Sequence, residues 1–168
     1  MEIVVNDANL FFDLLKADLI KDFFKLHFEV FTTDFVLGEV TDEKQLEIIG
    51  DLILNKELHV FQSDFETYSK IIQLSQQVAG LSIPDCSVWY LSKEKNYTLL
   101  TGDKLLRNTA MKDNITVKGL LYVFDQLVYH NIITPILAAE KLQFLIDTGT
   151  RLPTKECSRR IETWKKVV

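Results

Sequence analysis

The alternation of short β-rich runs with longer helical segments limits the fold of this chain more than any other feature. We expect strands at residues 3–5, 27–31, 58–61, 97–100 and 115–117, because each is a short apolar, β-branched or aromatic run. Strands that alternate with helices require parallel crossover connections, which bury both faces of the sheet. The sequence therefore predicts an α/β fold, a three-layer α/β/α arrangement around a central parallel sheet. The expected helices cover residues 8–24, 34–39, 42–54, 64–78, 84–93, 103–112, 119–130, 135–148 and 155–166. Asp34 can cap the second of these helices, and residues 63–66 fit a capping box at the start of the fourth.

The chain length favours one domain with a helical appendage. At 168 residues and 47% hydrophobic composition the chain can bury a core without disulfides or metals. No Gly/Ser-rich or Pro-rich linker interrupts it. We predict a single domain over residues 1–168, with a core over about 1–118 and a C-terminal helical extension over about 119–168.

The charge balance disfavours a general polyanion binder. The net charge is −5, although residues 151–168 carry six basic residues and two acidic ones. Phosphate binding depends on Lys and Arg. An acidic body suits a protein that gathers carboxylates around divalent cations. The basic end is either a solvated helix face or a contact for a nucleic-acid backbone.

The sequence also predicts a cytoplasmic location without a membrane span. Cys86 and Cys157 are the only cysteines, and a chain without a spaced cysteine framework is typical of a reducing compartment. No apolar run approaches the ~18 residues that a transmembrane helix needs, and the N-terminus lacks the basic segment of a signal peptide.

Common catalytic motifs are absent from the sequence. It contains neither a P-loop nor a dinucleotide-binding glycine pattern, and it has no Cys-x-x-Cys pair, no His-Glu-x-x-His motif and no Gly-x-Ser-x-Gly elbow. Nucleotide-dependent, zinc-dependent and serine-nucleophile chemistry therefore have no support.

Four acidic residues stand out by their positions. Asp7 and Asp103 each follow an expected strand, and ligands of open α/β sheets bind outside the carboxyl ends of the strands. Asp85 lies in the first turn of an expected helix, and Glu39 lies on the helix after the second strand. Each has a structural alternative, since Asp7 and Asp103 could cap helices, Asp85 could serve the helix dipole, and Glu39 could be a solvated glutamate.

The four acidic segments, in this order, resemble those of PIN-domain nucleases, the family that contains the VapC-type toxin ribonucleases. Residues 4–11 resemble the opening strand with its Asp-x-Asn signature, and residues 36–40 resemble the helix with its Glu-Val pair. Asp85 is similar to the third acid, and residues 99–104 resemble the Leu-x-Thr-x-Asp element. The match runs over about residues 2–117, and the last segment resembles a helical extension found in some members.

The resemblance implies a metal-dependent endoribonuclease. Asp7 and Asp103 would come from adjacent strands and be the main ligands of Mg²⁺ or Mn²⁺, ions that prefer oxygen ligands. Asp85 would complete the metal shell or orient the attacking water, and Glu39 would bind a second ion directly or through water. Asn9 and Thr101 would hydrogen-bond a carboxylate or a metal-bound water, although Thr101 could equally be a strand-end hydroxyl.

The predicted function is hydrolysis of RNA phosphodiester bonds, as the toxin of a type II toxin–antitoxin pair. The expected partners are single-stranded or structured RNA, an antitoxin protein and a second copy of the chain. The alternative is a PIN-fold binding or scaffold module with little nuclease activity. Trp89 and Tyr90 stand where relatives usually keep small or aliphatic residues, so no particular RNA is implied. Two aromatic pairs, Phe11–Phe12 and Phe23–Phe24, belong either to a homodimer interface or to a broadly buried helix.

Overall fold

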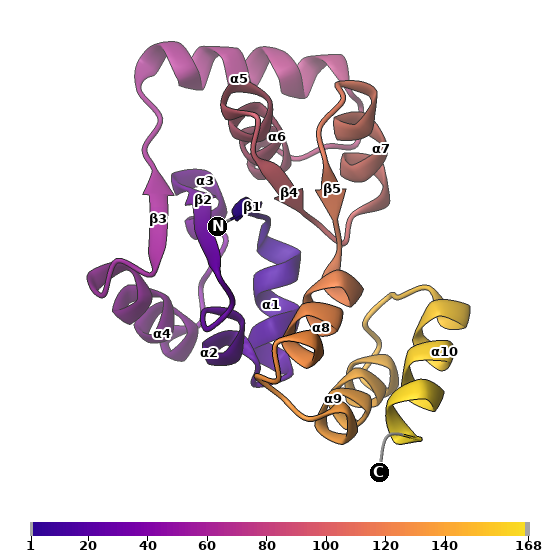
Figure 1. Ribbon diagram of the computed structural model, residues 1–168. Helices are drawn as coiled ribbons and strands as arrows, with labels where there is room; N and C mark the ends of the chain where they lie inside the picture. The colour runs from indigo at the N-terminus through magenta and orange to yellow at the C-terminus, as the bar shows by residue number, and fades with distance from the viewer. Residues whose placement is uncertain (1, 167–168) are drawn as a thin grey trace. The chain divides into compact units, whose positions relative to one another are not determined.

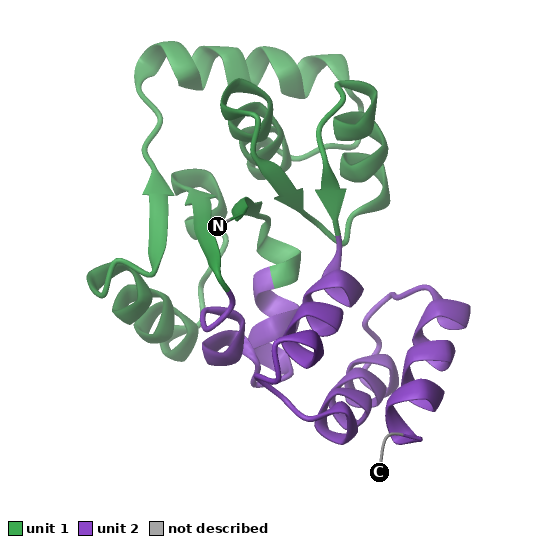
Figure 2. Ribbon diagram, viewed as in Figure 1, with its two compact units in different colours: residues 1–10, 27–118 green, residues 11–26, 119–168 purple. Residues whose placement is uncertain are grey.

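The computed structural model describes residues 2–166, which fall into two compact units (Figure 2). Unit 1 comprises residues 1–10 and 27–118, and unit 2 comprises residues 11–26 and 119–168. The elements of unit 1 are β1 (Glu2–Asn6), β2 (Phe28–Thr33), α3 (Asp34–Leu37), α4 (Glu43–Leu54), β3 (Leu58–Phe61), α5 (Phe65–Gln77), α6 (Ile83–Lys95), β4 (Thr98–Leu100), α7 (Lys104–Lys112) and β5 (Val117–Lys118). Helix α1 (Ala8–Lys16) begins in unit 1 and continues into unit 2, which also contains α2 (Ile20–Phe23), α8 (Leu120–Tyr129), α9 (Pro135–Asp147) and α10 (Thr154–Lys165).

A five-stranded parallel sheet with the order β3-β2-β1-β4-β5 forms the centre of unit 1 (Figure 1). The fold is α/β/α, as the alternation of strands and helices predicted. The first three strands are added in one direction and the last two in the other. The direction of strand addition reverses between β1 and β4, which makes this the topological switch point where ligands bind in open α/β sheets.

The two strands at the switch point are the most deeply buried part of the sheet. Val4 and Val5 of β1 and Leu99 and Leu100 of β4 are fully buried, because a parallel sheet covered by helices excludes water from both faces. β1 and β4 pair in register over Val4–Asn6 and Thr98–Leu100. The residues that follow these strands are therefore held side by side.

The single helix predicted over residues 8–24 is wrong, since α1 ends at Lys16 and α2 is separate. Asp18 has a φ of 54° and interrupts the helix. Its N–H donates to the Leu15 carbonyl while the Leu19 N–H donates to the Leu14 carbonyl, the hydrogen-bond pattern of a Schellman C-cap. Aspartate tolerates the left-handed conformation better than most residues, so the sequence pattern alone concealed this break.

The predicted helix carrying Glu39 is also shorter than expected. Thr33, not Asp34, is the N-cap of α3, because its hydroxyl accepts the Val36 N–H. The carboxylate of Asp34 instead accepts hydrogen bonds from the backbone N–H and the hydroxyl of Ser63, at 3.0 Å each. The helix ends at Leu37, so Glu39 lies in the turn that follows it and not on a helix.

The predicted cap of α5 shifts by one residue for the same kind of reason. The sequence suggested a capping box that starts at Ser63, but Asp64 is the N-cap and accepts the Thr67 N–H at 2.8 Å. Ser63 is already committed to Asp34, which links the carboxyl end of β2 to the segment after β3.

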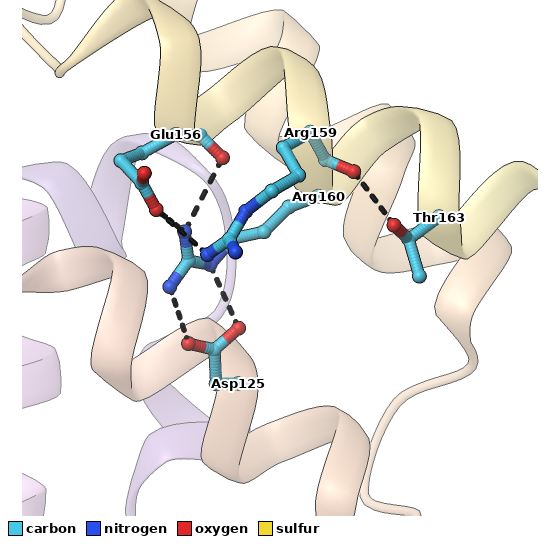
Figure 3. A network of polar contacts seen from close by, with 5 residues as sticks. All are labelled: Asp125, Glu156, Arg159, Arg160 and Thr163. Atoms are coloured by element: carbon cyan, nitrogen blue, oxygen red, sulfur yellow. Dashed lines mark hydrogen bonds and ion pairs between the residues drawn. The ribbon is translucent and has the colours of Figure 1, made fainter.

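An arginine network joins two helices of unit 2 (Figure 3). Arg160 of α10 donates two hydrogen bonds to the carboxylate of Asp125 in α8, at 2.8 and 2.7 Å. It also contacts Glu156 on its own helix. A bidentate pair of this geometry is stronger than a single ion pair. The rings of Phe124 and Trp164 stack nearby along the same two helices, with centroids 6.2 Å apart.

The aromatic pairs at the start of unit 2 divide between core and surface. Phe11 and Phe23 are fully buried, whereas Phe12 and Phe24 are half-buried. Their use in a homodimer stays a prediction. Both cysteines are buried and free. Among residues 2–166, no helix has the length and hydropathy needed to cross a bilayer.

Candidate active site

Asp7 is held at the switch point by three hydrogen bonds. Its backbone N–H donates to the Leu100 carbonyl of β4 at 3.1 Å, which extends the pairing of β1 with β4 by one residue. One carboxylate oxygen accepts the Leu10 N–H of α1 at 2.9 Å, and the other accepts the hydroxyl of Thr101. Asp7 is therefore a helix cap, as its structural alternative proposed, and is at the same time fixed at the end of a central strand.

Burial gives the Asp7 carboxyl group unusual proton affinity. The side chain is 1% exposed. Loss of hydration, with smaller contributions from the negative charges of Asp85 and Asp103, raises its pKa to about 7, against the opposing effect of its two hydrogen bonds. A carboxylate in this position is costly to ionise unless a cation lies beside it. A cation beside Asp7 would therefore lower the free-energy cost of ionising its carboxyl group.

Thr101 connects Asp7 to Asp103. While its hydroxyl donates to Asp7, the same oxygen accepts the backbone N–H of Asp103 at 3.0 Å. Asp103 is the N-cap of α7 and accepts the Leu106 N–H on Oδ1 at 2.6 Å. Arg107, one turn along α7, donates to the Thr101 carbonyl at 3.0 Å. The segment between β4 and α7 is therefore fixed at both its side chains and its backbone.

Asp85 takes part in a capping box at the start of α6. The Ser82 hydroxyl accepts the Asp85 N–H, while Oδ2 of Asp85 accepts both the N–H and the hydroxyl of Ser82, at 2.9 and 2.8 Å. The structural role considered for Asp85 was the helix dipole, and its observed role is this more specific cap. The hydroxyls of Ser87 and Thr33 lie 2.6 Å apart, which fixes the first turns of α6 against β2.

Glu39 and Asn9 lie at the margin of the site. Glu39 is exposed, and partial burial followed by the charge of Asp85 raises its pKa. This coupling places the two carboxylates within electrostatic range of each other. Asn9 is exposed in the first turn of α1, and the hydrogen bonds described above at Asp7 and Asp103 do not involve it. The role predicted for Asn9 beside a carboxylate stays a prediction.

The donor set of the aspartates fits a divalent cation by its chemistry. In the described part of the chain, Oδ1 of Asp85 and Oδ2 of Asp103 accept no hydrogen bond, and each oxygen of Asp7 accepts one and keeps a second lone pair. These are the oxygen ligands that Mg²⁺ and Mn²⁺ prefer. As the side chains stand, however, no group of three His, Cys, Asp or Glu residues within residues 2–166 is close enough to hold an ion. Electrostatic coupling links the acids, and the assignment of metal ligands among them stays a prediction.

Sequence reasoning did not single out Asn6, the last residue of β1. Its side chain is fully buried, and neither its amide nitrogen nor its amide oxygen has a hydrogen-bond partner among the described residues. Its backbone carbonyl accepts the hydroxyl of Thr32 at 3.2 Å. The sequence signal that could have singled out Asn6 is its position, as a polar residue between the apolar run 3–5 and Asp7.

Comparison with known proteins gives this site its context. A family model described as PIN domain (DUF3368) matches residues 3–166. The chain belongs to the PIN-domain family. The solved structures it resembles include a PilT N-terminus domain protein from the hyperthermophilic archaeon Sulfolobus solfataricus P2, at 13% identity and a TM-score of 0.48, over 75% of this chain and 93% of that one. A search of curated proteins gives no match.

Membership in the family agrees with the resemblance drawn from the four acidic segments. PIN domains are nuclease-type folds that typically use divalent metals. The PIN fold also explains why the first and fourth strands adjoin, as the resemblance implied: β1 and β4 are neighbours, and Asp7 and Asp103 follow them.

Proposed function

We propose that this PIN domain is an endoribonuclease that hydrolyses RNA phosphodiester bonds with Mg²⁺ or Mn²⁺. The observation that carries the proposal is the linked pair Asp7–Thr101–Asp103 at the switch point, with a buried acid whose pKa is raised to about 7. Burying such a carboxyl group costs folding free energy that a purely structural cap does not require.

Each acid of the site would have its own role in metal binding. Asp7 and Asp103 would be the main metal ligands, Asp85 would complete the shell or orient water, and Glu39 would serve a second ion. When bound, the divalent ions would activate a water and neutralise charge on the phosphate. Thr101 holds the Asp7 carboxylate in one orientation through its hydroxyl, and the caps of α6 and α7 hold Asp85 and Asp103.

The biological role follows the resemblance. We infer that the chain is the toxin of a type II toxin–antitoxin pair, that it acts on single-stranded or structured RNA, and that it associates with an antitoxin and with a second copy. We also infer a cytoplasmic location, which the two free, buried cysteines support.

The deciding experiment is cleavage of an end-labelled single-stranded RNA in EDTA, Mg²⁺ and Mn²⁺. We expect cleavage by the wild type only with metal, and its loss in Asp103→Asn. Asp13→Asn is the control, because Asp13 is also a half-buried carboxyl group that accepts a hydrogen bond, here from the Thr150 hydroxyl, but lies in unit 2. Cleavage that persists in EDTA or in Asp103→Asn contradicts the proposal.

The alternative function is a PIN-fold binding or scaffold module without hydrolysis. The caps made by Asp7, Asp85 and Asp103 are the observation in its favour, because each acid already has a structural partner. In the same assay this alternative predicts no cleavage by the wild type under any metal condition.

A further inference from the structure

Helix α7 differs in charge from the rest of unit 1. It begins directly after Asp103, and its charged residues are Lys104, Arg107 and Lys112, with no acidic residue between its caps. The chain as a whole carries 24 acidic residues against 19 basic ones. Within unit 1, α7 is therefore a short basic element that starts at the candidate active site.

The exposed residues of α7 form one stripe along the helix. Lys104, Asn108 and Lys112 are exposed and follow each other at intervals of four residues, which places them on one face. The apolar side chains of Leu105 and Met111 lie beside them and are 38% and 57% exposed. Within residues 2–166, neither Lys104 nor Lys112 forms an ion pair. Two lysine ammonium groups without an acidic partner thus lie on the solvent-exposed face of α7, next to the apolar side chains of Leu105 and Met111.

A hollow of about 480 Å³ borders this stripe. The end of α5 and the segment after it, α6 and α7 line it, with Gln77, Trp89, Lys93, Thr109 and Lys112 among the lining side chains. Its volume lies within the range of pockets that hold drug-sized ligands. We call the hollow and the exposed stripe together the α7 groove.

The one acidic residue that lines the hollow is already neutralised. The carboxylate of Asp113 accepts the indole N–H of Trp89 at 3.0 Å and pairs with the Lys93 ammonium at 2.9 Å. The positive charge of Lys112 therefore has no acidic counterpart in the hollow. An anionic ligand would gain from this charge without displacing an existing ion pair.

We propose that the α7 groove binds the phosphodiester backbone of single-stranded RNA and leads the strand away from Asp103. The inference rests on the nuclease function proposed above, and adds where the substrate lies beyond the cleaved bond. Lysines supply the phosphate contacts, and side chains such as Leu105 and Met111 supply apolar surface for bases. RNA is favoured over an acidic protein segment because the stripe begins at the residue that follows the candidate metal ligand Asp103.

The test is the salt dependence of RNA binding by Lys104→Gln/Lys112→Gln. Binding of a fluorescent single-stranded RNA is measured by anisotropy in EDTA at several salt concentrations, with DNA of the same sequence in parallel. Loss of two phosphate contacts lowers the slope of log affinity against log salt by about 1.4. The matched control is Lys44→Gln/Lys56→Gln, which removes the same charge from exposed residues at α4, and we expect it to keep the wild-type slope.

A second readout separates this proposal from the nuclease function. Cleavage of a dinucleotide, too short to reach from Asp103 to Lys112 at the far end of α7, is expected to be equal in the wild type and in Lys112→Gln, while KM for a longer RNA rises in that variant. If the wild type cleaves RNA but the double variant behaves like its control, the groove proposal is wrong and the nuclease function stands. If the wild type neither binds nor cleaves RNA, both proposals fail. Polyglutamate serves as a probe for an acidic protein segment. If the double variant keeps the wild-type salt slope for RNA but no longer binds polyglutamate, the groove binds an acidic protein and the proposal is wrong.

Discussion

The hydroxyl of Thr101 donates a hydrogen bond to the carboxylate of Asp7 across the junction of β1 and β4. The same oxygen accepts the backbone N–H of Asp103. One threonine therefore sets the orientation of one candidate ligand and the backbone position of the next.

Asp7→Asn is expected to stabilise the metal-free protein at pH 8 and to abolish RNA cleavage. The raised pKa means that ionised Asp7 lowers the free energy of unfolding, by at most about 1.4 kcal/mol for each pKa unit, while asparagine keeps an oxygen for the Leu10 N–H. Melting curves in EDTA and in Mn²⁺ measure the effect, and the variant should gain less from Mn²⁺ than the wild type. Asp13→Asn should keep both cleavage and the full gain from Mn²⁺. An Asp7→Asn protein that melts lower in EDTA and still cleaves RNA would show that Asp7 is only a cap.

The stability of the wild type in EDTA is expected to fall as the pH rises from about 4 to about 7. Between the ordinary aspartate pKa of 3.8 and the folded pKa of about 7, the native state holds a proton on Asp7 that the unfolded state has released. Since the native state binds more protons in this window, the free energy of unfolding decreases with pH there. Urea unfolding at pH 5 and pH 8 measures the difference. It should largely disappear in Asp7→Asn, and an equal fall in that variant would assign the effect to other groups.

Thr101→Val is expected to raise the pKa of Asp7 further and to reduce cleavage. The Thr101 hydrogen bond lowers that pKa in the wild type, and the valine also leaves the Asp103 N–H without its acceptor, which costs about 1–3 kcal/mol of stability. The pH–rate profile should shift to higher pH, an effect that a general loss of stability does not produce. Thr101→Ser keeps the hydroxyl and should restore the profile. A profile that does not move in Thr101→Val contradicts the proposed role of the hydroxyl.

Arg160→Met is expected to destabilise the protein by about 1–3 kcal/mol, while Arg159→Met has almost no effect. Arg160 is 17% exposed and makes the bidentate pair with Asp125, whereas Arg159 is 69% exposed and pairs only with Glu156 on its own helix (Figure 3). Exposed pairs of the second kind contribute little. Denaturant unfolding of Arg160→Met, Asp125→Asn and the double variant Asp125→Asn/Arg160→Met gives the coupling energy, with Arg159→Met as the control. Equal effects of the two arginine variants would show that the network adds no stability.

Ser82→Ala separates the two roles of Asp85. Loss of the N-cap hydroxyl should cost about 1 kcal/mol of stability but leave RNA cleavage intact, because the Asp85 carboxylate remains and still accepts the backbone N–H of residue 82. Asp85→Asn should reduce cleavage strongly at a similar cost in stability. Stability is measured by urea unfolding and cleavage with the labelled RNA. If both variants lose cleavage in proportion to their stability, Asp85 acts only as a cap.

The fold class, and the positions of Asp7 and Asp103 after strands, could be predicted from the sequence. Alternating apolar runs and helical periods imply parallel crossovers, and this physical constraint is local enough to be read from the chain. The positions of Asp7 and Asp103 after strands follow from the residues immediately around them. Their helix caps do too, because each cap is a hydrogen bond between residues three apart in the sequence. The family match over residues 3–166 agrees with this reading.

The features that join distant segments depend on tertiary packing. Thr101 and Asp7 are 94 residues apart in the sequence. The resemblance implied that Thr101 bonds a carboxylate, but the pairing of β1 with β4 makes Asp7 the partner. The raised pKa of Asp7 depends on burial by the whole unit. Asp34 was expected to cap a helix but binds Ser63 of another loop, because tertiary partners compete with local ones for the same carboxylate. The α7 groove likewise exists only once α5, α6 and α7 are packed together, since its charge pattern has meaning only beside the hollow that it borders.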